Sequence, residues 1–215
     1  MQLRRFARSM DGQRGFTLVD LIVATGLGLV ALTAILSFNR AQLFAVRNQA
    51  RQNDLQMTAR NIVDLFSREV RRAGGNPTCA PGISTIADAK QQLLRIQTDL
   101  NGDGAATGVD EDVTYQYKFS SRRFDRVANG NTDPLVEGVD LTGSRIRYFD
   151  GAGTEVTAGS TGLSSAQRSN VRRVRIELVM ARPQFDPQNS VPIRLEVAND
   201  IDLRNRYFVN PTGCP

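Results

Sequence analysis

The sequence contains no histidine among its 215 residues, and this absence removes most catalytic designs at the outset. Metal-dependent hydrolases, Ser-His-Asp triads and proton shuttles depend largely on the imidazole ring. The chain also carries no phosphate loop of the form G-x-x-x-x-G-K-[ST] and no zinc-ligand set. Acid pairs such as Glu111 and Asp112 are adjacent, so on a strand they point apart, which is poor geometry for shared acid–base work. We therefore expect that this protein is not an enzyme; a membrane-anchored exported enzyme is the disfavoured alternative.

Proline is absent before Pro77, so no proline interrupts the long apolar run near the start of the chain. The run extends from Phe16 to Phe38 and contains one ionisable side chain, Asp20. About 20 apolar residues are enough to cross the hydrocarbon core of a membrane as a helix. A secretory signal peptide would have a shorter apolar region followed by a small-residue cleavage site. The sequence therefore predicts a transmembrane helix over residues 16–38.

Acidic residues are scarce where this run begins, and the positive charge of the chain is concentrated there. Of the net charge of +5, residues 1–15 supply +3, because four arginines oppose Asp11 alone. The positive-inside rule then places the N-terminus in the cytoplasm and exports everything after Phe38. The rest of the chain carries only +2, so the basic balance indicates membrane orientation more than a nucleic-acid surface.

An amphipathic helix is expected to continue over residues 39–75. Its apolar positions recur every three or four residues and draw one stripe, formed by Leu55, Ala59, Ile62, Phe66 and Val70. Glycines at 74 and 75, followed by a proline at 77, end the pattern in the usual way. We expect one helix from about residue 16 to residue 73, apolar all round in its first half and covering a partner with one face in its second.

Beyond residue 75 the apolar pattern changes from a helical period to strict alternation. The alternating segments are 93–100, 112–120, 122–128, 143–150, 171–181 and 192–204. Turn-forming residues separate them, and alternation with one apolar face is typical of antiparallel strands. The sequence thus predicts an α+β protein in which residues 76–215 form an exported antiparallel β-sheet domain packed on the helix. Segment 150–170 is expected to be a mobile surface loop.

The two cysteines, Cys79 and Cys214, are not arranged as C-x-x-C, which disfavours a redox enzyme. Export would place them in an oxidising space, where an even count favours a disulfide. A bridge over so long a loop would stabilise the fold by up to about 4–5 kcal/mol on a chain-entropy estimate. Two unpaired thiols are the alternative.

The stretch TDLNGDGAATGVDED (98–112) matches the first half of a calcium-binding loop. Acidic or amide side chains stand at positions 1, 3 and 5, and a glycine stands at position 6. The expected ligands are Asp99, Asn101, Asp103, the Ala105 carbonyl, Thr107 and Asp110, with Asp112 as a competing acid. A structural Ca²⁺ ion is one interpretation, and an acidic turn between two strands is the other.

The motif Arg14-Gly15-Phe16-Thr17-Leu18-Val19-Asp20, directly followed by a spanning helix, resembles the processing signal of type IV prepilins. The resemblance implies that a prepilin peptidase removes leader 1–15 after Gly15 and that the new N-terminal residue, Phe16, is N-methylated. It also implies that Asp20, at the fifth mature position where Glu is usual, pairs with an N-terminal amine of its own or a neighbouring subunit during assembly. Such pairing would neutralise a carboxylate that is costly in lipid.

Shorter segments, including VRRAGG, DEDVTYQY and the closing IDLRNR, resemble minor pilins of the PilW type and the related minor pseudopilins of type II secretion. This resemblance implies a type IV pilin-like fold and a subunit that helps initiate or cap a type IV pilus, with a type II pseudopilin as the alternative. The implied partners are other minor pilins and the major pilin through the helix, the prepilin peptidase, the inner-membrane assembly platform and a tip adhesin. The implied location is the inner membrane with a periplasmic domain, then the pilus tip.

A third class of function, a membrane-anchored receptor for DNA uptake, depends on basic clusters near aromatic residues. The candidates are Arg122–Arg123 and Arg172, Arg173 and Arg175. Charge runs of this length are usually solvated faces, and a net charge of +2 after residue 15 gives weak support for binding a polyanion. We therefore do not expect nucleic acid as a partner.

Overall fold

A computed structural model describes residues 15–140, 142–159, 161–185 and 191–207 of the chain. The chain divides into two compact units whose boundary falls between Val46 and Arg47. A single helix, α1 (Leu18–Arg72), contributes to both units. This confirms the long helix that the apolar run and the apolar stripe predict, with its first residue two positions later than expected.

The first unit consists, in its described part, of the N-terminal half of α1. Its apolar side chains are exposed all round, as Leu18, Ile22 and Leu29 illustrate with exposed fractions of 75%, 60% and 67%. Within the described residues, α1 is the one helix long and apolar enough to cross a membrane. The composition of this half is therefore that of a single membrane span near the N-terminus.

The second unit contains the C-terminal half of α1, and here the helix buries one face. The buried positions are those of the predicted stripe, Leu55, Ala59, Ile62, Phe66 and Val70. The helix ends where Gly74 adopts a φ of +78°, a conformation that favours glycine. A Cβ at this position would also come 2.2 Å from the Thr85 hydroxyl. The backbone conformation of residue 74 and the closeness of Thr85 therefore both favour glycine here.

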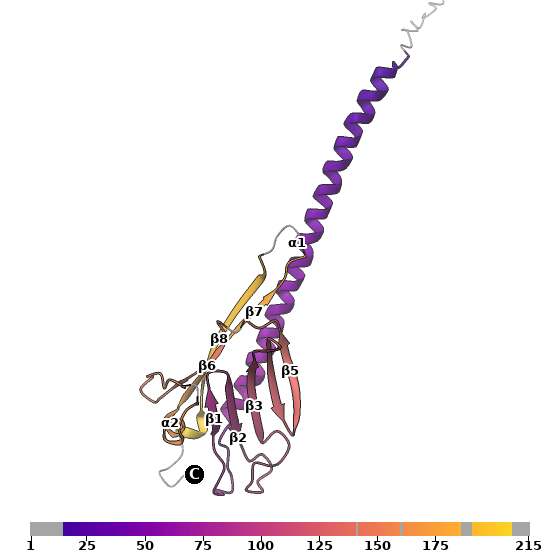
Figure 1. Ribbon diagram of the computed structural model, residues 1–215. Helices are drawn as coiled ribbons and strands as arrows, with labels where there is room; N and C mark the ends of the chain where they lie inside the picture. The colour runs from indigo at the N-terminus through magenta and orange to yellow at the C-terminus, as the bar shows by residue number, and fades with distance from the viewer. Residues whose placement is uncertain (1–14, 141, 160, 186–190, 208–215) are drawn as a thin grey trace, which may run out of the picture. The chain divides into compact units, whose positions relative to one another are not determined.

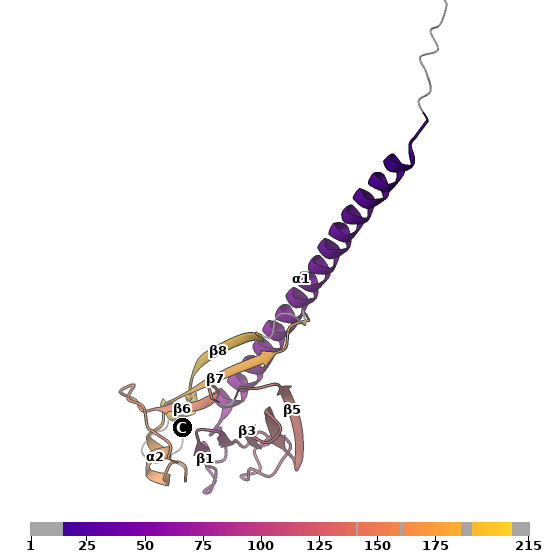
Figure 2. The ribbon, with the colours of Figure 1, turned by 45° about the horizontal axis from the view of Figure 1, so that its top comes forward.

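Most strands of the second unit form a five-stranded antiparallel sheet with the order β1-β2-β3-β4-β5 (Figures 1 and 2). The strands are β1 (Ile86–Lys90), β2 (Leu93–Gln97), β3 (Asp112–Lys118), β4 (Arg123–Ala128) and β5 (Asn131–Glu137). Their alternation is clearest in β3, where every second side chain is buried. Strands β1 and β5 escaped the sequence analysis, because IADAK and NTDPLVE lack clear alternation and β5 contains a proline that only an edge strand tolerates.

A second, three-stranded antiparallel sheet has the order β6-β7-β8. It contains β6 (Arg145–Phe149), β7 (Arg173–Arg182) and β8 (Ile193–Asp202). Of two short helices, α2 (Ser165–Asn170) lies against β1 of the first sheet, and α3 (Arg204–Tyr207) follows β8. The sequence predicted one sheet, whereas the chain forms two. The segment expected to be a loop is also partly ordered by local bonds, since Ser164 and Gln167 form a reciprocal capping box at the start of α2.

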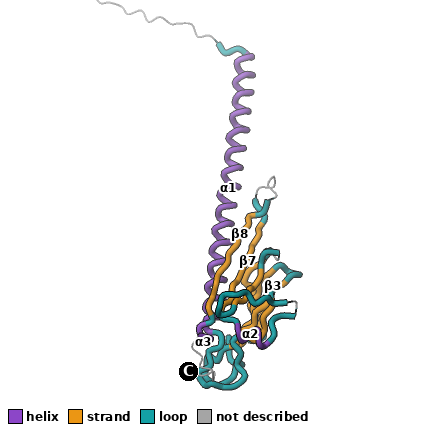
Figure 3. The backbone as a smooth tube through the Cα atoms, turned by 90° about the vertical axis from the view of Figure 1, so that its left-hand side faces the viewer, coloured by secondary structure: helices purple, strands orange, loops and turns teal. Residues whose placement is uncertain are grey.

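One hydrophobic core joins the helix and both sheets. Phe66 on α1 packs edge-to-face on Tyr115, with ring centroids 4.8 Å apart, and Tyr115 stacks on Phe124 at 5.8 Å. The buried Tyr148 of β6 reaches across to the first sheet, where its hydroxyl lies 2.8 Å and 2.9 Å from the carbonyl oxygens of Lys90 and Leu93. Beside α1, strands β7 and β8 run along its C-terminal half (Figure 3). The helix is therefore a structural element of the β domain as well as its N-terminal extension.

Candidate functional site

The predicted processing and assembly motif forms the N-terminal cap of α1. Thr17 precedes the helix, and its backbone N–H and hydroxyl donate to Asp20 Oδ2 at 3.0 Å and 2.8 Å. In return, the Asp20 N–H donates to the Thr17 hydroxyl at 3.2 Å. This reciprocal pair is a capping box, with the acid at the third helical position, and it satisfies N–H groups that the first helical turn leaves without partners. The predicted assembly carboxylate thus has a second role, which the spacing Thr-x-x-Asp indicates and which the sequence analysis missed.

The junction that would be cleaved lies at the free side of this cap. Phe16 has an exposed fraction of 95%, and a Cβ at Gly15 would meet no atom within 4 Å. No other part of the described chain covers this junction. Residues 1–14, with the arginines of the predicted leader, lie outside the described residues.

Polar side chains in the apolar half of α1 are satisfied within the helix itself. The Thr25 hydroxyl donates to Leu21 O at 2.9 Å, the Ser37 hydroxyl donates to Thr33 O at 2.8 Å, and Thr33 donates in the same way to Leu29 O. Hydroxyls paired in this way are tolerated in hydrocarbon. Asp20 differs from these hydroxyl groups because it is the single ionisable group of residues 16–38.

At the other end of α1 a buried carboxylate, Glu69, holds the helix to the first sheet. Its exposed fraction is 7%, and it accepts a hydrogen bond of 2.6 Å from the Tyr115 hydroxyl. Arg126 of β4 donates to Glu69 at 2.8–3.2 Å and to Asp110 at 2.7 Å. Burial acts to lower the pKa of Arg126, but its bonds to Glu69 and Asp110 outweigh this and raise the pKa above its ordinary value. The network links α1, the sheet and the acidic loop 98–112.

Two buried carboxylates organise the loop that matches a calcium-binding pattern. Asp99 accepts the N–H groups of Gly102 and Gly104 at 2.6 Å and 3.0 Å. Glu111, which is only 1% exposed, accepts those of Leu100, Asn101 and Gly108 at 2.9, 3.1 and 2.6 Å. Carboxylates that accept backbone N–H groups replace ladder hydrogen bonds that an irregular loop cannot make. The sequence analysis gave Glu111 no role in this loop.

Four of the other predicted calcium ligands, the side chains of Asn101, Asp103, Asp110 and Asp112, have protein partners. Asn101 and Asp103 bond to each other at 2.9 Å, and the Ala105 N–H donates to Asp103 at 2.8 Å. Asp110 is held by Arg126, as above. Asp112 forms a two-bond pair with Arg95 at 2.5 Å and 2.8 Å, and the hydrogen bond from Arg95 lowers the pKa of Asp112. The structure thus keeps the first three predicted ligands in one turn and turns the last two toward arginines.

Within the described residues, no group of three or more His, Cys, Asp or Glu side chains is placed to hold a metal ion. The fit of Ca²⁺ to this loop would require Asp110 and Asp112 to leave Arg126 and Arg95. Calcium binding stays a prediction. Melting of the whole protein in calcium and in chelator tests it, and a higher melting temperature in calcium is the response that a site would give.

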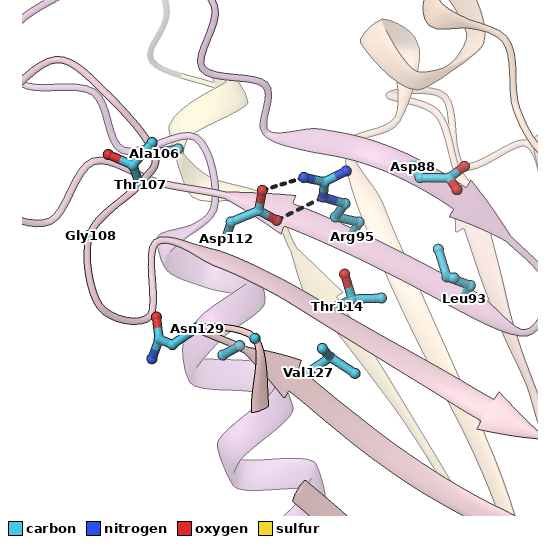
Figure 4. A pocket seen from close by; sticks show the side chains of 12 residues that line it. Asp88, Leu93, Arg95, Ala106, Thr107, Gly108, Asp112, Thr114, Val127 and Asn129 are labelled. Atoms are coloured by element: carbon cyan, nitrogen blue, oxygen red, sulfur yellow. Dashed lines mark hydrogen bonds and ion pairs between the residues drawn. The ribbon is translucent and has the colours of Figure 1, made fainter. Parts of the chain in front are cut away.

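A polar hollow of about 490 Å³ lies beside this loop, on the face of β2, β3 and β4 (Figure 4). The Arg95–Asp112 pair forms part of its lining, together with Thr114, Val127 and Asn129. The two charges of the pair cancel, and the Asp88 carboxylate leaves the lining with one net negative charge. Its lining residues include no cysteine, serine or histidine, and its hydroxyl groups are those of Thr107 and Thr114.

The remaining predicted site residues are dispersed. Cys79 is described, with a φ of 58°, but Cys214 lies outside the described residues, so the disulfide stays a prediction. Among the candidate nucleic-acid contacts, Arg175 pairs with Asp200 at 2.6 Å and Arg123 lies 3.3 Å from Asp125. These two arginines therefore have carboxylate partners within the fold.

Comparison with protein-family models, with curated proteins and with solved structures finds no match to this chain. The chain's own features that bear on function are the capped motif at Gly15–Asp20, the apolar half of α1 and the β domain that the rest of α1 supports.

Proposed function

We propose that this protein is a type IV pilin-like subunit, anchored in a membrane by the first half of α1 and assembled into a filament through that same half. Within this class we propose a minor pilin that helps initiate or cap a type IV pilus. A minor pseudopilin of a type II secretion system would use the same parts. The observation that carries the proposal is the motif Gly15-Phe16 followed by Asp20, the one carboxylate in the otherwise apolar, exposed residues 16–38.

In this proposal the apolar half of α1 has two successive environments. Before assembly, lipid covers its side chains, and after assembly the same side chains pack against helices of neighbouring subunits. Both environments are apolar, so the exchange costs little hydrophobic free energy. The two environments differ in the partner that they offer to the Asp20 carboxylate. A carboxylate away from water needs a partner of opposite charge.

Cleavage between Gly15 and Phe16 would create that partner. A new α-amino group would form at Phe16, one residue before the capping Thr17, whose N–H already contacts Asp20. A positive amine can therefore reach the carboxylate within its own chain or from a neighbour in the filament, by a charge-assisted hydrogen bond. Pairing with a neighbour would also fix the axial register of the subunits.

In this proposal the β domain is the part of the subunit that lies outside the membrane and then outside the filament core. The Glu69 network and the aromatic contacts of Phe66 attach this domain to the same helix that enters the filament core. Its proposed partners are the other minor pilins, the major pilin and a tip adhesin, and the assembly platform and prepilin peptidase act on the anchored precursor. In this proposal the domain binds no nucleic acid.

The Asp20 side chain offers the sharpest test of the assembly step. Asp20→Asn keeps the hydrogen-bonding shape of the cap and removes the charge, so the protein should still enter the membrane but appear in sheared filaments at a strongly reduced level. Asp20→Glu should assemble as well as the native chain. Equal recovery of all three forms in filaments would contradict the proposal. Membrane recovery of each form controls for expression.

A further inference from the structure

One end of the β domain is defined by four segments that meet around the point where α1 enters it. The turn between β3 and β4 joins the segment after β5, because the Val139 N–H donates to Arg122 O at 2.9 Å and Arg122 Nε donates to Val139 O at 3.3 Å. That segment joins the end of β7, where the Ala181 N–H donates to Gly138 O at 2.9 Å. Pro183 in turn accepts a hydrogen bond from Arg51 of α1. Residues 47–51, 118–123, 137–140 and 181–185 are called the basic end below.

The basic end carries more positive than negative charge. Its basic side chains are Arg47, Arg51, Lys118, Arg122, Arg123 and Arg182. Of its acids, Asp125 on the adjoining strand is completely buried between Lys118 and Arg123, each 3.3 Å away. Asp140 pairs with Arg194 at 3.0 Å, and Glu137 remains exposed. A net positive charge therefore faces solvent.

Aromatic side chains project from the same end. Phe119, in the turn after β3, has an exposed fraction of 58%. Phe185 is 39% exposed, and the guanidinium of Arg51 lies 3.8 Å from its ring centroid. Exposed aromatic rings among arginines are typical of surfaces that enter the boundary between lipid headgroups and acyl chains, because the ring can enter the apolar layer while the cation stays with the phosphates.

The charge is reversed at the opposite end of the same strand. Strand β3 begins at Asp112 in the acidic loop and ends at Lys118 at the basic end. A strand of seven residues separates these two ends by about 20 Å. Arg95 neutralises Asp112 and Arg126 faces Asp110, but the acidic loop also carries Asp99, Asp103 and Glu111, so its net charge stays negative. The domain is thus electrically polar along β3, and an anionic surface would attract one end and repel the other.

Chain connectivity keeps the basic end close to any membrane that the helix crosses. Phe38, the last residue of the apolar run, and Arg47 are nine residues apart within one unbroken helix. Nine helical residues correspond to about 14 Å. Electrostatic attraction to a charged surface extends over roughly 8 Å at physiological salt, so the length of chain between the span and the domain exceeds this range by only a few residues of helix.

From the charge, the aromatic rings and the short connection, we propose that the basic end binds anionic phospholipid headgroups, with Phe119 inserted at the interface, while the subunit is anchored before assembly. This inference rests on the proposed membrane span. The lipid contact holds the domain against the bilayer and points the acidic loop away from it. Extraction of the subunit into a filament must then break this contact.

The chain contains no tryptophan, so a single introduced indole reports on its own surroundings. Phe119→Trp places the reporter at the basic end, and Val109→Trp places it in the acidic loop, where the native side chain is 74% exposed. The whole protein is placed in nanodiscs of phosphatidylcholine alone or with phosphatidylglycerol. We expect the emission of the Phe119→Trp variant to shift to the blue and to be quenched by brominated lipid in the anionic discs, with loss of both effects at high salt. The emission of the Val109→Trp variant should not change.

Charge variants provide matched controls in the Phe119→Trp background. Arg122→Ser with Arg182→Ser removes two positive charges from the basic end and should reduce the blue shift and quenching in anionic discs. Arg60→Ser with Arg71→Ser removes the same charge from exposed positions elsewhere on α1 and should leave both effects unchanged. Equal effects of the two double variants would overturn a specific role of the basic end.

Flotation of the protein with liposomes separates this inference from the proposed function. Failure to float would overturn the membrane span on which both depend. Flotation without a blue shift would overturn the lipid contact alone. An equal shift in neutral and anionic discs would overturn the headgroup selectivity, and a shift that appears in detergent and grows with protein concentration would assign the basic end to a second subunit in place of lipid.

Discussion

Arg126 of β4 holds the buried carboxylate of Glu69 on α1 with bonds of 2.8–3.2 Å, while the same guanidinium reaches Asp110 in the acidic loop. The side-chain exposures of Arg126 and Glu69 are 11% and 6%, so water screens this pair poorly. An arginine with a rigid planar fork suits such a position better than a lysine. The pair therefore ties the C-terminal half of α1 to the first sheet of the β domain.

Loss of Arg126 should destabilise the domain strongly. Arg126→Met keeps the volume but leaves the Glu69 charge buried with only the Tyr115 hydroxyl as partner, which should lower the free energy of unfolding by about 3–5 kcal/mol. Arg145→Met removes an exposed pair with Glu177, in which the arginine side chain is 53% exposed, and should cost less than about 1 kcal/mol. Denaturant unfolding of the whole protein in detergent compares the two, and equal losses would show that the Glu69 pair has no special weight.

The acidic loop should depend on Glu111 more than on Asp103. Glu111→Gln exchanges a buried carboxylate that accepts three backbone N–H groups for an amide with one acceptor oxygen, at a cost of about 2–3 kcal/mol. Asp103→Asn changes an exposed side chain and should stay within about 0.5 kcal/mol. Hydrogen exchange at residues 100–108 should accelerate in the first variant and not in the second. Acceleration in both would indicate that overall loop charge, and not the Glu111 bonds, fixes the loop.

Acid should weaken the second sheet through its outer carboxylates. Burial acts to raise the pKa of Glu177, but hydrogen bonds from Arg145 and Arg147 outweigh it and lower the pKa from its ordinary 4.5. The hydrogen bond from Arg175 lowers the pKa of Asp200 from 3.8. Groups with a depressed folded pKa stabilise the fold above the unfolded pKa and lose that contribution as pH falls through the folded value. The melting temperature should therefore decrease as the pH is lowered below about 4.5, and Glu177→Gln should make this decrease smaller. A slope unchanged by this substitution would assign the acid sensitivity to other groups.

Removal of the predicted disulfide should cost up to about 4–5 kcal/mol. The double variant Cys79→Ser with Cys214→Ser should show this loss in the free energy of unfolding under all conditions. A reductant should cause the same loss in the native chain and should have no further effect on the double variant. Mass spectrometry after alkylation counts free thiols. Two alkylated cysteines in the unreduced, unfolded protein would show that the bridge does not form.

Local patterns in the sequence were enough to predict α1 and its buried stripe, because helical periodicity depends on residues three or four apart. The division of the strands into two sheets was not predictable in this way. Val139 and Met180 form a β-bridge, and the Tyr148 hydroxyl reaches carbonyl groups at positions 90 and 93. These are partnerships between distant segments, and alternation within a strand says nothing about its neighbour.

The acidic loop shows a further limit of prediction from the sequence. The spacing of Asp99, Asn101 and Asp103 matches a calcium pattern, but spacing cannot reveal that Arg95 and Arg126 approach Asp112 and Asp110 from other strands. Glu69 was missed for the same reason. It lies beside the apolar stripe, and only the folded sheet shows that Tyr115 and Arg126 compensate its burial.

The N-terminal residue of the protein recovered from its native membrane tests the proposed class most directly. Intact-mass and peptide mass spectrometry should find a chain that begins at N-methylated Phe16, and Gly15 replaced by a bulky residue should leave residues 1–15 attached. A chain that retains Met1 in assembled filaments, or one cut at a different position, would contradict the type IV pilin-like assignment.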